Sequence, residues 1–332
     1  MGPRRKLRKE DTAQMTHRRE ASVALAIVTL GLVLAAAAPG FFARDNLSDL
    51  FLANLPVLIV ALGMTLIILT GEIDISVGSA FAISGVVAGL LAKAGLPMPL
   101  VAVSTCLVGA VLGGLNGALV AYVRIPSIVV SLATMVALRD GLRWATDGAW
   151  IQDLPANFQW LGLTQAAYPF VALATAAALT VALGGGLRHL AAGRAVYATG
   201  SNREAARLAG LHTAFVTFAV FSLAGGLTGL AALLNSVRFN QIPSNAGLGL
   251  ELKVIAAVVV GGTAISGGRG SIAGTVLGVM LLGAIGPALT FLGVSAYWER
   301  AIQGAIILAA VAFDALRDRP VTHAVTMRVA RT

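Results

Sequence analysis

The chain has little charge, few aromatic side chains and almost no cysteine. Charged residues make up 12% of its 332 residues, whereas a typical soluble domain contains about 25%. The residues AVILMFWYC make up 57% of the chain, and aromatic residues only 6%. This composition excludes an ordinary soluble domain and predicts a protein that crosses a membrane several times.

The scarcity of reactive side chains excludes several kinds of site. Cys106 is the single cysteine, so the chain can form no internal disulfide. The four histidines are scattered and show no metal-ligand spacing. The phosphate-binding string Gly-x-x-x-x-Gly-Lys-Ser/Thr does not occur, because the glycine-rich stretch 267–271 lacks the lysine. We therefore predict no catalytic site, no metal site and no ATPase site in this chain.

Apolar segments follow one another along most of the chain. A membrane-spanning helix needs about 20 apolar residues, so the fifth, eighth and tenth segments are expected to be tilted, broken or re-entrant. The sequence predicts an all-α polytopic protein of about ten transmembrane segments, some of them short or broken. The segments lie near 21–38, 52–70, 79–92, 98–121, 125–138, 166–185, 213–234, 252–262, 271–291 and 301–313.

The net charge of +9 gathers at three places: residues 1–20, the loop 186–212 and the tail 314–332. Basic residues beside membrane spans favour the cytoplasmic side, and an even number of crossings puts all three places there. We therefore expect cytoplasmic termini around a transmembrane domain at 21–313. Basic tracts can also bind nucleic acid, but beside membrane spans they more often contact anionic lipid, so we predict lipid and no nucleic acid.

The stretch 71–79 (GEIDISVGS) carries two carboxylates and two hydroxyls between uncharged apolar runs at 50–71 and 75–92. A charge at membrane depth is costly and usually faces a bundle interior or a water-filled cavity. Glycines allow the backbone to leave helical geometry, which is tolerated at that depth only where protein or water covers it. The stretch therefore predicts part of a solute path, although a polar turn at the membrane surface is the alternative.

The stretch 71–76 (GEIDIS) shows a weak internal sequence similarity to 261–266 (GGTAIS). Interrupted segments at matching places in two halves point to a central site in transporters, although chance can also explain this match. The residues expected along the path are Glu72, Asp74, Ser76, Ser79, Asn116, Ser266 and Ser271, and those expected to gate it are Gly71, Gly78, Gly261, Gly262 and Arg269. Arg269 is a candidate ion-pair partner of Glu72 or Asp74. Small polar residues in membrane helices can instead bond across helices, and this alternative stays open.

Small residues recur four apart in two segments, at Gly109, Gly113 and Gly117 and again at Gly270, Gly274 and Gly278. This spacing lets helix backbones approach closely in lipid, so we expect tight helix packing at both places.

The loop 186–212 contains a pattern typical of a short helix over 201–210. Ser201 and Glu204 have the spacing of a capping box, and Gly210 suits the helix end. Ala205, Leu208 and Ala209 would form an apolar contact strip, with Arg203 and Arg207 left in water. An ordinary loop helix without a partner is the alternative.

The pattern EAAxxxG at 204–210 resembles the cytoplasmic signature of permease subunits of bacterial ABC importers. The Ile-x-Leu-Pro tail of its longer form is missing here, which argues against the permease class best known for it. Other stretches resemble monosaccharide permeases of the ribose type, and 139–144 (RDGLRW) looks closer to the rhamnose and autoinducer-2 members. The ribose-type stretches are LGMTL at 62–66, GEIDISVGS at 71–79, RIPSIVV at 124–130, YATGSN at 197–202, LELKVIAAVVVGG at 250–262 and ISGGRGS at 265–271.

This resemblance covers about residues 50–315. It implies a permease in the bacterial inner membrane that imports a monosaccharide or a related polyol-like solute. It also implies a second permease copy or paralogue, two cytoplasmic ATPase subunits that hold the ATP, and a periplasmic or surface solute-binding protein. The chain itself would bind no cofactor. Contact with the ATPase would involve Ser201, Arg203, Glu204, Ala205, Ala206, Arg207 and Gly210.

Three other functions remain to be weighed. A proton-coupled secondary transporter would use Glu72 or Asp74 as the proton carrier and would need no ATPase. A non-transporting membrane scaffold would use the basic termini as its contact surface. A membrane enzyme would need a nucleophile–base pair or a metal cluster, and the sequence contains neither pattern.

Overall fold

The computed structural model describes residues 3–295 together with 297–299, 301–302, 304–305 and 308. Within these residues the chain is helical, and the one β-type pairing is an isolated bridge between Ile151 and Ile242. The elements are α1 (Pro3–Ala37), η1 (Pro39–Phe42), α2 (Arg44–Leu69), α3 (Val77–Lys93), α4 (Met98–Ala118), η2 (Leu119–Val123), α5 (Ser127–Ala145), η3 (Gln159–Gly162), α6 (Tyr168–His189), α7 (Ala191–Ser201), α8 (Arg203–Leu208), α9 (Thr213–Ser236), α10 (Leu250–Val260) and α11 (Ile272–Phe291).

The all-helical membrane fold predicted from composition is confirmed. Six stretches of the described helices are long and apolar enough to cross a membrane: Glu20–Ala37, Arg44–Leu69, Met98–Val123, Tyr168–His189, Thr213–Ser236 and Ile272–Phe291. The other expected segments coincide with the shorter helices α3, α5 and α10, except the last, at 301–313, most of which lies outside the described residues. The helix α10 has 11 residues, about half the length of a full crossing.

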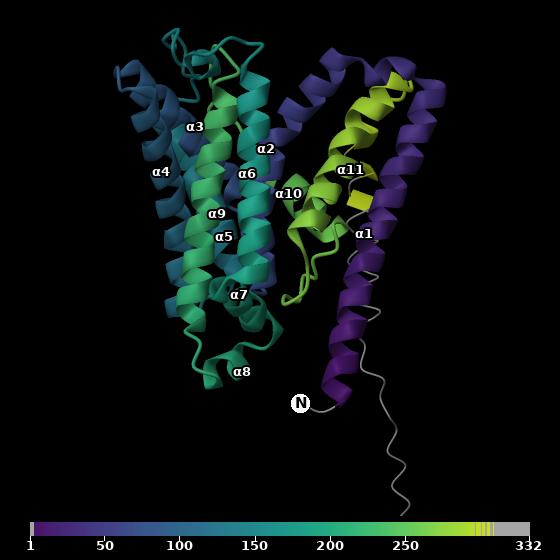
Figure 1. Cartoon of the computed structure of the whole chain (residues 1–332). Coiled ribbons are helices and arrows are strands. Elements are labelled where there is room, and N and C mark those ends of the chain that lie inside the picture. Colours follow the sequence, from purple (N-terminus) through teal and green to yellow (C-terminus); the bar gives the residue numbers. More distant parts are fainter. Residues whose placement is uncertain (1–2, 296, 300, 303, 306–307, 309–332) are drawn as a thin grey trace, which may run out of the picture.

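The helix α2 lies at the centre of the bundle. In Figure 1, α3, α4, α5, α6 and α9 gather on one side of it, and α1 and α11 lie on the other. Of its membrane-span window, 78% is buried, compared with 11% for α1 at the periphery. The hydroxyls of Thr65 on α2 and Thr275 on α11 bond across the interior at 2.6 Å.

The α7–α8 pair projects from the end of the bundle where α1 begins (Figure 1). The connection between α5 and α6 lies at the opposite end. The basic N-terminal segment and the 186–212 loop therefore lie at one end of the molecule, as the positive-inside pattern predicts.

Glycine spacing brings helix backbones into contact, as predicted. A Cβ on Gly109 would overlap the carbonyl oxygen of Gly225 on α9, and one on Gly113 would overlap the carbonyl oxygen of Phe221. Between α10 and α11, a Cβ on Gly278 would overlap the carbonyl oxygen of Ala257. In lipid the hydrophobic effect does not bring helices together, so close packing of this kind stabilises their association instead.

Substituting Gly113→Ala is expected to lower the free energy of unfolding in detergent by about 1–3 kcal/mol, because the methyl group overpacks the α4–α9 contact. The control is Gly185→Ala on α6, where a Cβ would meet no atom within 4 Å. There the better helix propensity of alanine should leave stability unchanged or slightly raised. Equal thermal midpoints for the two variants would contradict the packing argument.

Candidate solute path and coupling helix

The chain leaves helical geometry between α2 and α3, as the sequence predicts for residues 71–76. Helix α2 ends at Leu69, Gly71 takes the left-handed conformation (φ 82°), and α3 begins at Val77. Asp74 and Ser76 in this linker are buried. An irregular segment with a buried carboxylate needs internal hydrogen-bond partners, because lipid provides none.

Side chains from the neighbouring helices α4 and α5 extend a chain of hydrogen bonds that begins at the polar groups of the linker. The Oδ1 atom of Asp74 accepts from the backbone N–H of Ser76 at 2.8 Å and from its hydroxyl at 2.7 Å. The Nδ2 of Asn116 on α4 donates to Ser76 Oγ at 2.8 Å, and the hydroxyl of Thr134 on α5 donates to Asn116 Oδ1 at 2.8 Å. The structure therefore brings together three of the predicted path residues, and they bond to one another.

The remaining hydroxyls of the predicted path have separate positions. Ser79 donates to the carbonyl of Met135 on α5 at 2.8 Å. Ser271 caps α11 by accepting from the N–H of Gly274 at 2.9 Å, and it also bonds Glu20 of α1. Ser266 is exposed. The structure thus gives Ser79 and Ser271 clear roles in joining elements.

The second break, between α10 and α11, lies against the first. The N–H of Gly268 donates to the carbonyl of Leu69 at 2.9 Å, so it satisfies the C-terminal end of α2. A Cβ on Gly267 would lie 2.8 Å from the backbone N of Gly71. The two segments with similar sequences therefore lie against each other in the structure. Gly261 and Gly262 belong to the same break, and Gly261 packs against the carbonyl of Gly274.

Helix α7 lies against both breaks. A Cβ on Gly200 would overlap the carbonyl of Leu69 and would lie 2.7 Å from the N of Gly268. The hydroxyl of Tyr197 donates to the carbonyl of Gly270 at 2.9 Å. Burial raises the pKa of Tyr197 above its ordinary value, with a smaller opposing effect from Arg188. Tyr197 is therefore a neutral donor in this contact.

The structure pairs Glu72 with Arg203 at the start of α8 and not with Arg269, which the sequence had offered as a candidate. The Arg203 Nη2 lies 2.6 Å from Glu72 Oε1 and 3.4 Å from the hydroxyl of Thr217 on α9. The Glu72 side chain is only 13% exposed. Helix α7 contacts both breaks and leads directly into α8. Arg203 at the start of α8 therefore lies close enough to the α2–α3 linker to bond Glu72. A direct ion pair therefore joins the linker to α8.

The loop 186–212 folds into two helices, α7 and α8, which meet at Asn202. The predicted capping box was wrong by one position. Ser201 is the last residue of α7, and Asn202 caps α8 by accepting from the N–H of Ala205 at 2.9 Å. Asn202 has extended backbone (φ −164°, ψ 100°), which suits an N-cap. Glu204 pairs with Arg207 at 3.0 Å instead of closing a box.

The end of α8 and its apolar strip agree with the sequence. Gly210 has φ 85° and stops the helix in the left-handed conformation. Ala206 is buried, whereas Ala205 and Ala209 are exposed and Leu208 is 80% exposed. Helix α8 projects from the end of the bundle (Figure 1), and the residues of its apolar strip, Ala205, Leu208 and Ala209, are exposed.

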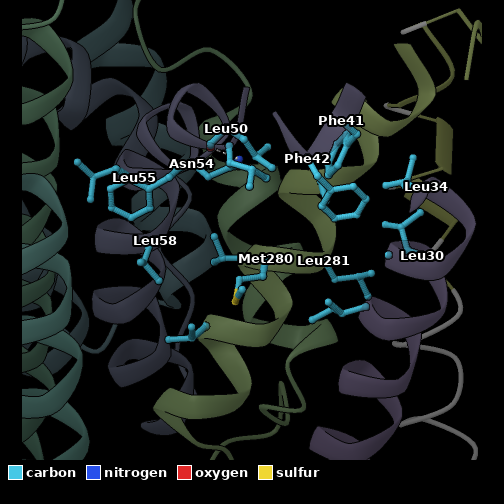
Figure 2. Close-up of a pocket in the computed structure, with 17 residues that line it drawn as sticks. Leu30, Leu34, Phe41, Phe42, Leu50, Asn54, Leu55, Leu58, Met280 and Leu281 are labelled. Carbon is cyan, nitrogen blue, oxygen red and sulfur yellow. Dashed lines mark hydrogen bonds between the residues drawn. The ribbon is translucent and has the colours of Figure 1, made fainter. Parts of the chain in front are cut away.

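A cavity of about 330 Å³ between α1, α2 and α11 has the wrong lining for a polar solute. Figure 2 shows Leu30, Leu34, Phe41 and Met280 among its walls. Asn54 is the one polar side chain among the described residues that line it. An apolar lining of this kind favours contact with hydrocarbon groups.

Sequence reasoning did not find Thr134, Asn202 or the pairing of Arg203 with Glu72. No spacing along the chain relates residue 134 to 116 or 203 to 72, since these contacts depend on how helices pack. Asn202 had a local signal, because asparagine directly before an acidic first turn is a favoured N-cap. In the described part of the chain, no group of three or more His, Cys, Asp or Glu side chains is placed to hold a metal.

Membrane helices around two mutually bonded breaks, with an exposed helix at one end, define a polytopic membrane permease. Residues 46–311 match the family described as branched-chain amino acid transport system / permease component, and the chain belongs to this family. It is the transmembrane permease subunit of an ATP-driven importer and a multi-pass protein of the bacterial inner membrane. Permeases of this kind work with ATPase and solute-binding partners, and they are transport subunits, not enzymes.

Curated relatives extend over nearly the whole chain. The chain is 36% identical over 301 residues to the "Autoinducer 2 import system permease protein LsrC" of Salmonella typhi, which covers 89% of this chain and 85% of the relative. It is 38% identical over 306 residues to the protein of the same name from Escherichia coli (strain K12 / DH10B), with 89% and 86% covered. No solved structure matches the chain.

Substituting Asn116→Leu is expected to lower the free energy of unfolding by about 1–3 kcal/mol, because buried Ser76 and half-buried Thr134 lose their shared partner. The measurement is thermal unfolding of the purified protein in detergent. The control is Asn240→Leu at an exposed position, which should unfold like the wild type. Equal stability of the two variants would show that the hydrogen-bond chain does not hold the linker.

Proposed function

We propose that this chain forms half of a membrane path for a small hydroxyl-rich solute, either autoinducer 2 or a monosaccharide-like molecule. Two supports carry the solute class: the relatives at 36–38% identity are named as autoinducer 2 import permeases, and the bundle interior holds neutral hydrogen-bonding groups. The aromatic platforms that high-affinity sugar sites use are scarce, since aromatic residues make up 6% of the chain. A separate solute-binding protein would then supply most of the selectivity.

The proposed assembly contains two permease subunits, identical or paralogous, two cytoplasmic ATPase subunits and one solute-binding protein outside the membrane. ATP binds to the ATPase subunits, and this chain binds no cofactor. In the proposed topology about ten segments cross the membrane, with both termini and the 186–212 loop in the cytoplasm. The common end shared by the start of α1 and by α8 supports this arrangement (Figure 1).

The contact between Arg203 and Glu72 carries the proposed mechanism. The ATPase would bind the apolar strip of α8, and closure of the ATPase pair would displace that helix. Arg203 would transmit the displacement to the α2–α3 linker through its 2.6 Å contact with Glu72. Because the linker lies against the α10–α11 break, both breaks would move together. Ser266, Gly78 and Arg269 remain candidate path or gate residues in this proposal.

The energy source separates the proposal from its rival, a proton-coupled secondary transporter. The test is uptake of labelled autoinducer 2 and labelled ribose into proteoliposomes that hold the complete complex. The proposal predicts uptake that requires ATP and is indifferent to a proton gradient. Uptake that follows an imposed gradient without ATP would favour the rival.

Substituting Leu208→Glu is expected to abolish stable co-purification of the ATPase subunits, because a charge replaces the apolar side chain at the centre of the strip. Leu208 is 80% exposed, so the fold should be unaffected. The matched control is Leu163→Glu, at an exposed leucine in the α5–α6 connection at the other end of the bundle. If the ATPase subunits still co-purify with the Leu208→Glu variant, they bind elsewhere.

Substituting Arg203→Glu is expected to reduce ATP-driven uptake about tenfold or more and to lower stability by roughly 1–3 kcal/mol, since the mostly buried Glu72 loses its partner and faces a like charge. The exchange Glu72→Arg with Arg203→Glu should restore much of the uptake. The control Arg143→Glu removes an exposed arginine on α5. Normal uptake by the single Arg203→Glu variant would remove the ion pair from the mechanism.

A further inference from the structure

Arg139 on α5 and Glu251 at the start of α10 face each other in the bundle without making a hydrogen bond. The Nη2 of Arg139 lies 3.8 Å from Oε2 of Glu251, and the two side chains are 19% and 10% exposed. Both atoms are buried and have no hydrogen-bond partner among the described residues. Each therefore has unused capacity, one as a donor and one as an acceptor.

This arrangement is poor for stability alone. Burying two charges has a large desolvation cost, which only close contact and further hydrogen bonds offset. A buried donor or acceptor without a partner costs a further 1–3 kcal/mol or so. Such groups are few in native proteins, and each calls for a physical explanation.

Four other buried side-chain atoms of the described residues also lack a partner, but none belongs to an ion pair: Ser84 Oγ, Thr199 Oγ1, Arg238 Nε and Thr263 Oγ1. Glu72 contacts Arg203 at 2.6 Å, and Lys253, two residues after Glu251, contacts Glu299 at 3.0 Å. The chain of bonds from Asp74 to Thr134 is internally satisfied. A solute hydroxyl would have to displace an existing bond in that chain, whereas Arg139 and Glu251 could accept a solute without losing one.

The pair lies at the start of α3, beside a loop that contains two left-handed glycines. A Cβ on Gly78 would overlap Glu251 Oε2 and would lie 3.1 Å from Arg139 Nη2 and 2.5 Å from the carbonyl oxygen of Gly247. The start of α3 has no side-chain cap. Gly247 (φ 75°) and Gly249 (φ 79°) lead into α10. A shift of this loop would separate Glu251 from Arg139 and open space at the start of α3.

We propose that Arg139 and Glu251 are solute-contacting residues, closed on each other in this conformation, that bind neighbouring hydroxyls of the solute when the loop before α10 moves away. The guanidinium donates to one hydroxyl oxygen, and the carboxylate accepts the hydrogen of the adjacent hydroxyl. A vicinal diol provides both groups at the required separation, so the ligand class is a small polyol or sugar-like molecule. The site rests on the proposed transport function and specifies where the solute is held.

The test is the double variant Arg139→Met with Glu251→Met, reconstituted with its ATPase and binding-protein partners in proteoliposomes. Apolar side chains of similar length remove an unsatisfied pair, so the thermal midpoint should equal or exceed that of the wild type. Uptake of labelled autoinducer 2 and of labelled ribose should fall roughly 100-fold, because two charge-assisted hydrogen bonds are lost. ATP hydrolysis stimulated by the binding protein should stay within about twofold, since neither residue lies on the ATPase-binding strip.

The matched control is Asp140→Asn with Arg143→Gln, which removes the exposed ion pair on the same helix and should leave uptake unchanged. Near-normal uptake by the double methionine variant would overturn the assignment. Failure of that variant to fold would overturn it too, because the pair would then be structural. The single variant Glu251→Gln gives an independent readout: a raised half-saturating solute concentration with little change in stability supports the site, and an unchanged value contradicts it. Wild-type uptake that needs no ATP would instead count against the proposed function alone.

Discussion

The structure depends on a constraint that lipid imposes on the backbone. Where a helix breaks at membrane depth, its freed N–H and C=O groups must find protein partners. A hydrogen bond joins the α2–α3 and α10–α11 breaks: the N–H of Gly268 donates to the carbonyl of Leu69 that ends α2, and glycines at 71 and 267 permit the close approach. Neither break could keep its geometry if the other moved away, so the two form one mechanical unit.

That unit extends to the end of the molecule that carries α7 and α8. Helix α7 packs on both breaks through Gly200 and Tyr197, and Arg203 at the start of α8 holds Glu72 in the first break. The Tyr197 and Arg203 contacts are hydrogen bonds, and the Gly200 contact is a close backbone packing that a larger side chain would prevent. The exposed strip on α8 is therefore linked to the bundle centre by direct side-chain and backbone contacts.

Sequence patterns were sufficient for some parts of this structure and insufficient for others. Hydropathy predicts the helices because the bilayer requires long apolar runs, and glycine spacing predicts a close helix contact along α4, although not that α9 is the partner, because close approach needs small residues. The break at 71–76 was predictable from its glycine and its carboxylates in an apolar setting, whereas its role in a solute path stays a prediction. The partner of Glu72 was not predictable, because Arg203 and Arg269 are both distant in sequence and only packing decides between them. The pairing of Arg139 with Glu251 had no sequence signal for the same reason.

The central claim is that α8 and the two breaks move as one body when the ATPase closes. Spin labels on cysteines at Glu204 and Ser266, in a chain whose Cys106 is replaced by serine, would report the distance between α8 and the second break. A third label at Leu107, on the outer face of α4, provides a reference for the rest of the bundle. We predict that addition of a non-hydrolysable ATP analogue to the complete complex leaves the 204–266 distance unchanged while the 204–107 distance shifts. A change in the 204–266 distance, with 204–107 constant, would contradict the account.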